Sequence, residues 1–432
     1  MKIISRKYVF TSIIILLAAL IVLISSSCCI DLSKFSKSGG KSITFGENQE
    51  QADKNDLGTQ SESRKVDYSI IKKELSEASD YRISKEEEEI FFSSLEKIYP
   101  EEKYILVRDY LDKYKILYPC GYYTLLKVTQ EPDINGGGYG WFIITNSTKE
   151  YYSVEEIEEE MKKLLEEDAN DSTEDVQDFD GSISVPDFYE EYGSDLKMIL
   201  HELTHGGSRA FGFLFVDDLK DRSWETHYSY MIGNLLIFME KEKMFFSKYE
   251  IFSDIKNPDH NDKLYHDPNK TFVIEGEEHK PGDIDFSAIL DEINAYTVSA
   301  KHDIATEEFM PLKNSCNTRY GLLKQLSYLE LYLKRCNEKY PEDWQYLTEH
   351  KGMAFLIMKL WYESLKIEAV IKDDPRFSKD SGPVAEFVYD PSNYGIIEMF
   401  FKESEILEHK NKDFKDIDAE FDNITVYDIN DS

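Results

Sequence analysis

Apolar residues recur at helical spacing over several long stretches of this chain. In the first of these stretches, Ile90, Phe91 and Leu95 share one stripe, which predicts one or two amphipathic helices at the start of the folded region. Later stretches place Leu, Tyr, Phe, Ile and Trp on one face in the same way. We therefore predict a mainly helical protein, with helices in segments 69–99, 317–340 and 344–371.

Other segments predict a smaller content of strand. Residues 122–130 and 139–147 are rich in aromatic and β-branched side chains, and a glycine-rich turn separates them. An acidic segment over 153–180, predicted as a helix that passes into a loop, and a short edge strand over 181–185 follow. The fold class is therefore predicted as α+β, with a small sheet-containing N-terminal lobe at 67–190, a helical region at 191–409 and an acidic tail at 410–432.

The first residues have the pattern of an export signal. Basic residues precede an apolar stretch from Tyr8 to Ile24, and serines lead to Cys28 and Cys29. This resembles a bacterial lipoprotein signal peptide over residues 1–29, which implies a lipid on Cys28, with Cys29 as the alternative. An uncleaved membrane anchor is the other interpretation. The polar segment 30–66 then predicts a flexible tether to a folded part outside the cytoplasm, in the cell envelope.

Composition limits the classes of partner. The 432 residues are 41% hydrophobic and 13% aromatic, which is typical of globular proteins. The formal net charge is −34, so a nucleic-acid partner is not expected, because phosphate recognition needs a cationic surface. Five cysteines, two of them in the leader, are too few for a disulfide scaffold.

Residues 194–207, SDLKMILHELTHGG, predict a half-buried helix with a metal-binding motif. Its predicted start is Ser194 and its predicted end is Gly206 or Gly207. His201 and His205 lie four residues apart, so their imidazoles share one helix face at a separation that suits one Zn²⁺. Glu202 between them can reach the attacking water as a general base. This is the HExxH arrangement.

A catalytic zinc needs a third protein ligand, and the best candidate is Glu292 in DFSAILDEINAYTVSAKHD, residues 285–303. It is embedded in the apolar stripe of a predicted helix, where a carboxylate is costly without a compensating positive charge. The small Ala295 would allow a close approach of the two helices. Asp291 and Glu225 remain alternative ligands.

HELTH followed by DEINAY resembles the zincin metallopeptidases of the gluzincin group. The resemblance implies a zincin-like catalytic region, with His201, His205 and Glu292 as zinc ligands and Glu202 as the catalytic base. It covers the two helices and the chain between them. Tyr296, four residues after Glu292, is a candidate to support a ligand imidazole or the oxyanion. Thermolysin-type enzymes carry an acidic residue at this position, and this chain departs from them there.

The predicted function is that of an exported, membrane-tethered zinc peptidase acting on peptides or proteins. Two alternatives stay open: a surface lipoprotein that binds a host or envelope partner without catalysis, and an envelope amidase acting on cell-wall peptides. Tyr228, Tyr230 and His302 are further oxyanion candidates, and His227 is predicted to begin a long apolar helix.

Overall fold

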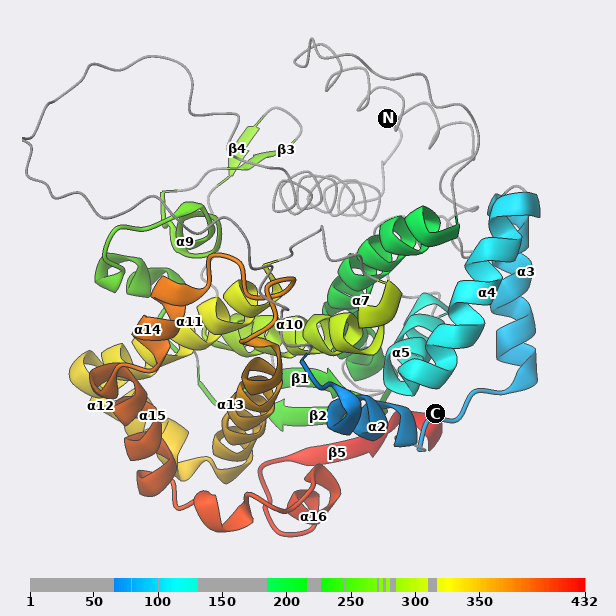
Figure 1. Cartoon of the computed structure of the whole chain (residues 1–432). Coiled ribbons are helices and arrows are strands. Elements are labelled where there is room, and N and C mark those ends of the chain that lie inside the picture. Colours follow the sequence, from blue (N-terminus) through cyan, green and yellow to red (C-terminus); the bar gives the residue numbers. More distant parts are fainter. Residues whose placement is uncertain are drawn as a thin grey trace, which may run out of the picture.

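Helices dominate the described part of the chain, and a small antiparallel sheet packs beside them (Figure 1). The computed structural model describes residues 66–130, 185–215, 227–309 and 317–431, apart from 79, 100, 244, 270–271, 275–276 and 280–284. The α+β, mainly helical class agrees with the prediction. The leader, the tether, the strand predicted at 139–147 and the acidic helix predicted at 153–180 lie outside the described residues.

The N-terminal part is helical throughout its described length. A capping box starts the second helix, because the Ser84 hydroxyl accepts from the Glu87 amide and the Glu87 carboxylate accepts from the Ser84 amide. The predicted stripe buries Phe91 and Leu95, whereas Ile90 is exposed. The helices are α2 (Ser69–Glu77), α3 (Lys85–Ile98), α4 (Glu101–Leu117) and α5 (Pro119–Gln130).

The strand predicted at 122–130 is wrong, because these residues belong to α5. Tyr122, Tyr123, Leu125 and Leu126 are all buried in one core cluster. A helix that is apolar on most faces has a composition similar to that of a buried strand. The aromatic and β-branched content of this segment was therefore not decisive.

The motif helix is longer than predicted at both ends. α7 runs over Val185–Phe215 and passes through Gly206 and Gly207 without a break. A Cβ on Gly207 would lie 2.6 Å from the Met231 sulfur and 3.0 Å from Val128, so the glycine allows close packing of α7 against its neighbours. Gly207 therefore serves helix packing and does not end the helix.

The apolar helix predicted from His227 is a β-hairpin instead. Strands β1 (His227–Ile232) and β2 (Leu235–Glu240) pair antiparallel through a turn in which Gly233 has a φ of 65°. The predicted acidic tail is also structured, with helix α16 (Phe414–Asp418) and strand β5 (Thr425–Asp428). β5 pairs with β2, so the sheet order is β1-β2-β5.

The region after residue 240 is mostly helical. The segment predicted as one helix over 344–371 is divided at His350, whose Nδ1 accepts from the Met353 amide and caps the second helix. The elements here are η5 (Lys248–Asp254), α9 (His260–His266), β3 (Phe272–Ile274), β4 (Glu277–His279), α10 (Ser287–Ala305), η6 (Glu307–Phe309), α11 (Thr318–Lys339), α12 (Pro341–Glu349), α13 (Lys351–Ile371), α14 (Gly382–Val388), α15 (Pro391–Glu403), η7 (Leu407–His409) and η8 (Ile429–Asp431).

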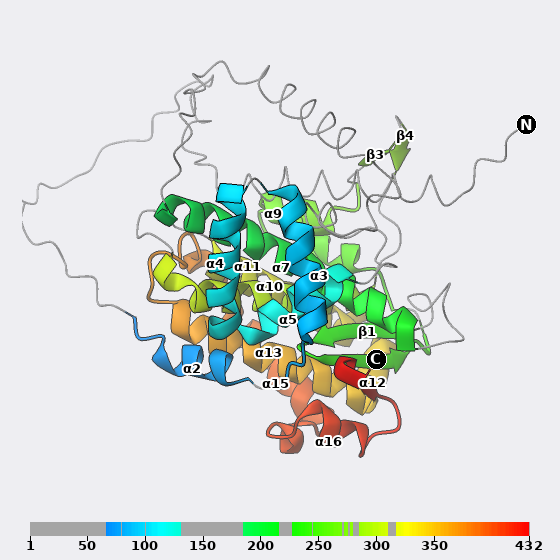
Figure 2. The ribbon, with the colours of Figure 1, turned by 90° about the vertical axis from the view of Figure 1, so that its right-hand side faces the viewer.

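Helix α10 crosses the middle of the molecule between two apolar cores (Figures 1 and 2). Ile289, Leu290 and Ile293 near its start belong to the core of the C-terminal helices. Ala300 and Ile304 near its end belong to the core formed with α2–α5 and α7. Both halves of α10 are thereby fixed by packing. Among the described residues, no helix combines the length and apolar character needed to cross a bilayer.

Candidate metal centre

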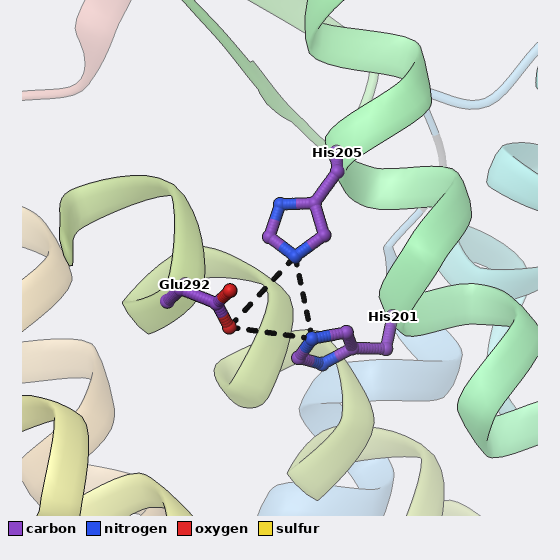
Figure 3. A group of neighbouring side chains, drawn as sticks. All are labelled: His201, His205 and Glu292. Atoms are coloured by element: carbon purple, nitrogen blue, oxygen red, sulfur yellow. Dashed lines mark hydrogen bonds and ion pairs between the residues drawn. The ribbon is translucent and has the colours of Figure 1, made fainter. Parts of the chain in front are cut away.

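Two histidines from α7 and one glutamate from α10 converge on a common point (Figure 3). The Nε2 atoms of His201 and His205 lie 3.3 Å apart. Oε2 of Glu292 lies 3.5 Å from the first of these nitrogens and 3.9 Å from the second. The structure thus brings together the three ligands predicted from HELTH and DEINAY. Among the described residues, these three are the group of His, Cys, Asp or Glu side chains whose donor atoms lie close enough together to hold one metal ion.

The separations of the three donor atoms suit a zinc ion. With bonds of about 2.0–2.2 Å, neighbouring donors of a tetrahedral zinc site lie roughly 3.3–3.6 Å apart. Two of the three observed separations, 3.3 and 3.5 Å, lie in this range, and the third, 3.9 Å, is longer. The donor set of two imidazoles and one carboxylate also matches the preference of Zn²⁺.

Hydrogen bonds on the far side of each ring orient the donors. Nδ1 of His205 lies 2.8 Å from the Asp291 carboxylate, which can accept but not donate, so this nitrogen carries the proton. Nδ1 of His201 lies 3.4 Å from the Ser299 hydroxyl. In its neutral form His205 then presents the Nε2 lone pair toward Glu292, whose Oε2 is buried without a hydrogen-bond partner among the described residues. Such an arrangement is repulsive until a cation occupies it.

The electrostatics of the centre also favour a positive charge. Burial alone would lower the pKa of His205, but Asp291, together with the charges of Glu292 and Glu202, raises it to about 10. Burial would raise the pKa of Glu292, but the contact with His201 and the positive charges of His205 and Lys248 lower it to about 2. In the metal-free protein, a proton on His205 supplies this positive charge. The side chains remain 15–20% exposed, so the centre can be approached.

Glu202 lies beside the converging donors and is not one of them. It follows His201 directly, so its side chain leaves the helix about 100° around from that histidine. The residue is half-buried, and its charge raises the pKa values of both His205 and Tyr265. The charge of Glu202 thus acts on His205, and its role as a general base stays a prediction.

Tyr296 contacts the centre through its ring. The ring packs edge-on against His201, with 4.8 Å between centroids. Its hydroxyl lies 3.3 Å from the hydroxyl of Tyr265 on α9. Gly321 leaves room for this ring, because a Cβ there would lie 2.4 Å from the Tyr296 Cε1 atom. The two phenols are therefore held beside the ligand His201.

The alternative candidates from the sequence have other positions. Asp291 bonds to the ring of His205 on the side away from Nε2, so it positions this ligand. Glu225 lies outside the described residues. The hydroxyls of Tyr228 and Tyr230 lie near Asp285 and Ser287, and His227 stacks on Phe238.

His302 is a packing residue and not an oxyanion group. Its Nδ1 lies 2.9 Å from the Tyr114 hydroxyl, and its Nε2 lies 2.9 Å from the Gly193 carbonyl oxygen. Burial lowers the pKa of His302 to about 4, with a contribution from the charge of Lys197. Both ring nitrogens are thus engaged inside the protein.

Sequence reasoning missed the supporting roles of Asp291, Ser299 and Tyr265. For Ser299 a signal existed, because it follows Glu292 by seven residues, or two helical turns, and so shares its face. Asp291 was predicted only as an alternative ligand. Its contact with Nδ1 of His205 depends on how α10 is rotated against α7, which the sequence does not reveal. Tyr265 approaches the site only through tertiary packing of α9.

Comparisons of the chain with protein-family models, with curated proteins and with solved structures gave no match. The assignment of a function therefore depends on the geometry of the centre.

Proposed function

We propose that this protein is a zinc-dependent peptidase. The observation that carries the proposal is the convergence of three electron-pair donors at zinc spacing, with Glu202 next to one of them in the motif. His201, His205 and Glu292 would hold the ion, which leaves its fourth position for water or substrate. Support also comes from the hydrogen bonds of Asp291 and Ser299, because such outer partners fix the orientation of metal-binding histidines.

The chemistry would be the hydrolysis of a peptide bond. A zinc ion at this position supplies Lewis acidity that polarises the scissile carbonyl group and lowers the pKa of water. Glu202 takes a proton from the attacking water and passes it to the leaving amine. Tyr296 and Tyr265 lie on the side of His201, where their hydroxyl groups can donate to the oxygen that gains charge.

The place of action that we propose is outside the cytoplasm. The leader pattern supports export and a lipid anchor on Cys28, which would hold the enzyme at the membrane of the cell envelope. The substrates would then be peptides or proteins present there. Mass spectrometry of the mature protein would detect a diacylglyceryl modification at this cysteine, and an unmodified Cys28 and Cys29 would contradict it.

The test compares Glu202→Gln with the wild-type chain. We expect the variant to keep its zinc, since Glu202 is not a ligand, and to lose peptide cleavage by about 10²- to 10⁴-fold. Zinc content is measured by elemental analysis, and cleavage by mass spectrometry on a mixed-sequence peptide library and on cell-wall peptides. Glu338→Gln, at an exposed position on α11, is the matched control and retains the wild-type rate.

Two results would contradict the proposal. A zinc-loaded wild-type protein that cleaves no peptide would favour a binding protein with a structural metal. An unchanged rate in Glu202→Gln would remove the general base from the mechanism. Cleavage confined to cell-wall peptides would instead assign the enzyme to that substrate.

A further inference from the structure

The backbone of Met231 in β1 connects the two helices that carry the metal-binding residues. Its amide donates a hydrogen bond to Oγ of Ser208 on α7 over 2.9 Å, and its carbonyl oxygen accepts one from Nδ2 of Asn294 on α10 over 2.8 Å. Met231 and Ser208 are 2% exposed and Asn294 is 3% exposed, so water has little access to these bonds. A single residue of the sheet thus bridges both helices.

The hairpin explains why Met231 has both backbone groups to offer. The two-residue turn places Ile232 opposite Leu235, and Met231 is the next residue along β1, opposite Leu236. In an antiparallel pair, alternate residues direct their N–H and C=O groups away from the partner strand. Met231 is such a residue, because both of its groups bond to helices. At this position α7 and α10 therefore occupy the edge of β1.

Both helix ends of the bridge lie close to metal-binding residues. Ser208 follows His205 by three residues and His201 by seven, so it shares the face of α7 that carries the two imidazoles. Asn294 follows Glu292 by two residues in α10. Each bridging residue and its neighbouring donor belong to one continuous helix, so a shift of either helix at the bridge displaces the donor atoms as well.

A second contact between the two helices lies on the other side of the histidines. Nζ of Lys197 on α7 lies 2.5 Å from Oδ2 of Asp303 on α10. Along α7, both metal-binding histidines lie between Lys197 and Ser208. Two contacts rather than one thereby fix the separation and the relative rotation of the helices. A metal site needs this precision, because its ligands must be held to within about 0.5 Å.

The bridge is anchored in regular structure at each end. Oγ of Ser208 donates to the carbonyl oxygen of Thr204 over 2.9 Å, which leaves its lone pairs for the Met231 amide. The hairpin itself is supported from behind, because β5 pairs with β2 and the Ile429 amide donates to the Asn234 carbonyl oxygen over 2.8 Å. Positions on helices and strands are held more precisely than positions on loops.

We propose that Ser208 and Asn294 are positioning residues of the metal centre, which act through the Met231 backbone to hold α7 and α10 at the separation that the ion requires. Neither residue belongs to the group that would hold the ion. The inference rests on the metal-binding part of the proposed function, because it takes the converging histidines and glutamate to bind zinc. It does not depend on the cleavage of a peptide.

The test measures the zinc affinity of the full-length protein by titration with a competing chelator, without any peptide. Asn294→Leu removes the donor of the bridge and Ser208→Ala removes its acceptor. Each should lower zinc affinity about tenfold, as the loss of an outer support of metal ligands does. Because either substitution opens the same bridge, the double variant should also lose about tenfold, and not the roughly hundredfold expected of independent effects.

A control and a spectrum separate positioning from a general loss of stability. Thr297→Val removes a different buried hydrogen bond of α10, the one to Ser364 on α13 over 2.9 Å, and should keep the wild-type zinc affinity. In the Co²⁺-loaded protein the visible absorption bands report the arrangement of the ligands. These bands should change in Asn294→Leu and in Ser208→Ala and stay unchanged in Thr297→Val.

Three outcomes would overturn the inference: wild-type affinity in both bridge variants, an equal loss in Thr297→Val, or losses that multiply in the double variant. Should Asn294→Leu fail to fold, the affinity and Co²⁺ spectrum of Ser208→Ala decide. Cleavage by the wild-type protein is scored separately. A protein that binds zinc through the bridge but cleaves no peptide contradicts the proposed function alone, and a wild type that binds no zinc contradicts both.

Discussion

Two glutamates on neighbouring helices are buried in opposite surroundings. Glu292 on α10 faces two imidazoles and is held ionised, with its pKa lowered to about 2. Glu330 on α11 is 1% exposed, and neither of its oxygens has a hydrogen-bond partner. Burial raises the pKa of Glu330 to about 9, with a contribution from the charge of Asp390. The first is a carboxylate and the second is a neutral acid at pH 7.

The difference shows what distinguishes a ligand from a tolerated buried acid. Burial favours the protonated form of both residues. At Glu292 this tendency is overcome by charges that lie within reach, and the resulting anion faces the Nε2 atoms of two imidazoles. At Glu330 no charge among the described residues opposes it, and that of Asp390 adds to it. The groups that share the space with each carboxyl group therefore decide its charge.

The largest effect that tests this comparison is on zinc affinity. Glu292→Gln should lower zinc affinity by at least about 10²-fold, because a neutral amide replaces one of the three protein ligands. Glu330→Gln should keep the wild-type affinity. Both are measured by titration with a competing chelator. Equal affinities for the two variants would contradict the assignment of Glu292 as a ligand.

A smaller effect is expected from Asp291, which touches the centre through His205. Asp291→Asn should lower zinc affinity by about 10- to 100-fold, because the amide is a weaker hydrogen-bond acceptor for the imidazole and carries no negative charge. Ser253→Ala, at an exposed serine on η5, serves as a control that should leave the affinity unchanged. Unaltered affinity in Asp291→Asn would show that the hydrogen bond does not support the ligand.

The pH dependence of zinc binding sharpens the comparison further. In the metal-free protein His205 keeps a proton up to about pH 10, whereas Glu292 has already lost its proton above about pH 2. Zinc must therefore displace one proton, and the affinity should rise about tenfold per pH unit between pH 6 and 8. Calorimetry in buffers of different ionisation enthalpy counts this proton. In Asp291→Asn the rise of zinc affinity with pH should be shallower. A flat profile in the wild type would show that zinc binding displaces no proton.

The smallest effect concerns the stability contributed by Glu330. Between pH 4.5, the ordinary value, and about 9, the folded protein binds a proton at Glu330 that the unfolded chain has released. The free energy of unfolding therefore falls as the pH rises through this window. Glu330→Gln removes the dependence, so its Tm should exceed that of the wild type by a few degrees at pH 8 and by less at pH 5. Glu338→Gln, exposed on the same helix, should follow the wild type at both pH values.

Much of the site could be predicted from the sequence because its signals are local. The spacing of His201 and His205 is a property of one helix, and Glu292 was detectable as an acid within an apolar stripe. The long helices α10, α11 and α13 followed from the same periodicity. These inferences needed no knowledge of how distant segments meet.

The errors arose where tertiary packing decides the local structure. Residues 122–130 are buried on most sides, so their composition did not separate α5 from a strand. Gly207 was interpreted as a helix end, although its role is contact with Met231. The hairpin after His227 did have a local signal, because Gly233 and Asn234 form a two-residue turn between two apolar runs.

The position of α10 between two cores has a consequence for ion selectivity. A ligand carried on a helix that is packed at both ends cannot retreat to accommodate a larger ion. Ca²⁺ takes six to eight oxygens at about 2.3–2.6 Å, which a rigid frame with two nitrogens and one carboxylate does not offer. The frame instead suits small borderline metals such as Zn²⁺, Co²⁺ or Cu²⁺. The choice among these would depend on metal supply in the compartment, because the donor set accepts all of them.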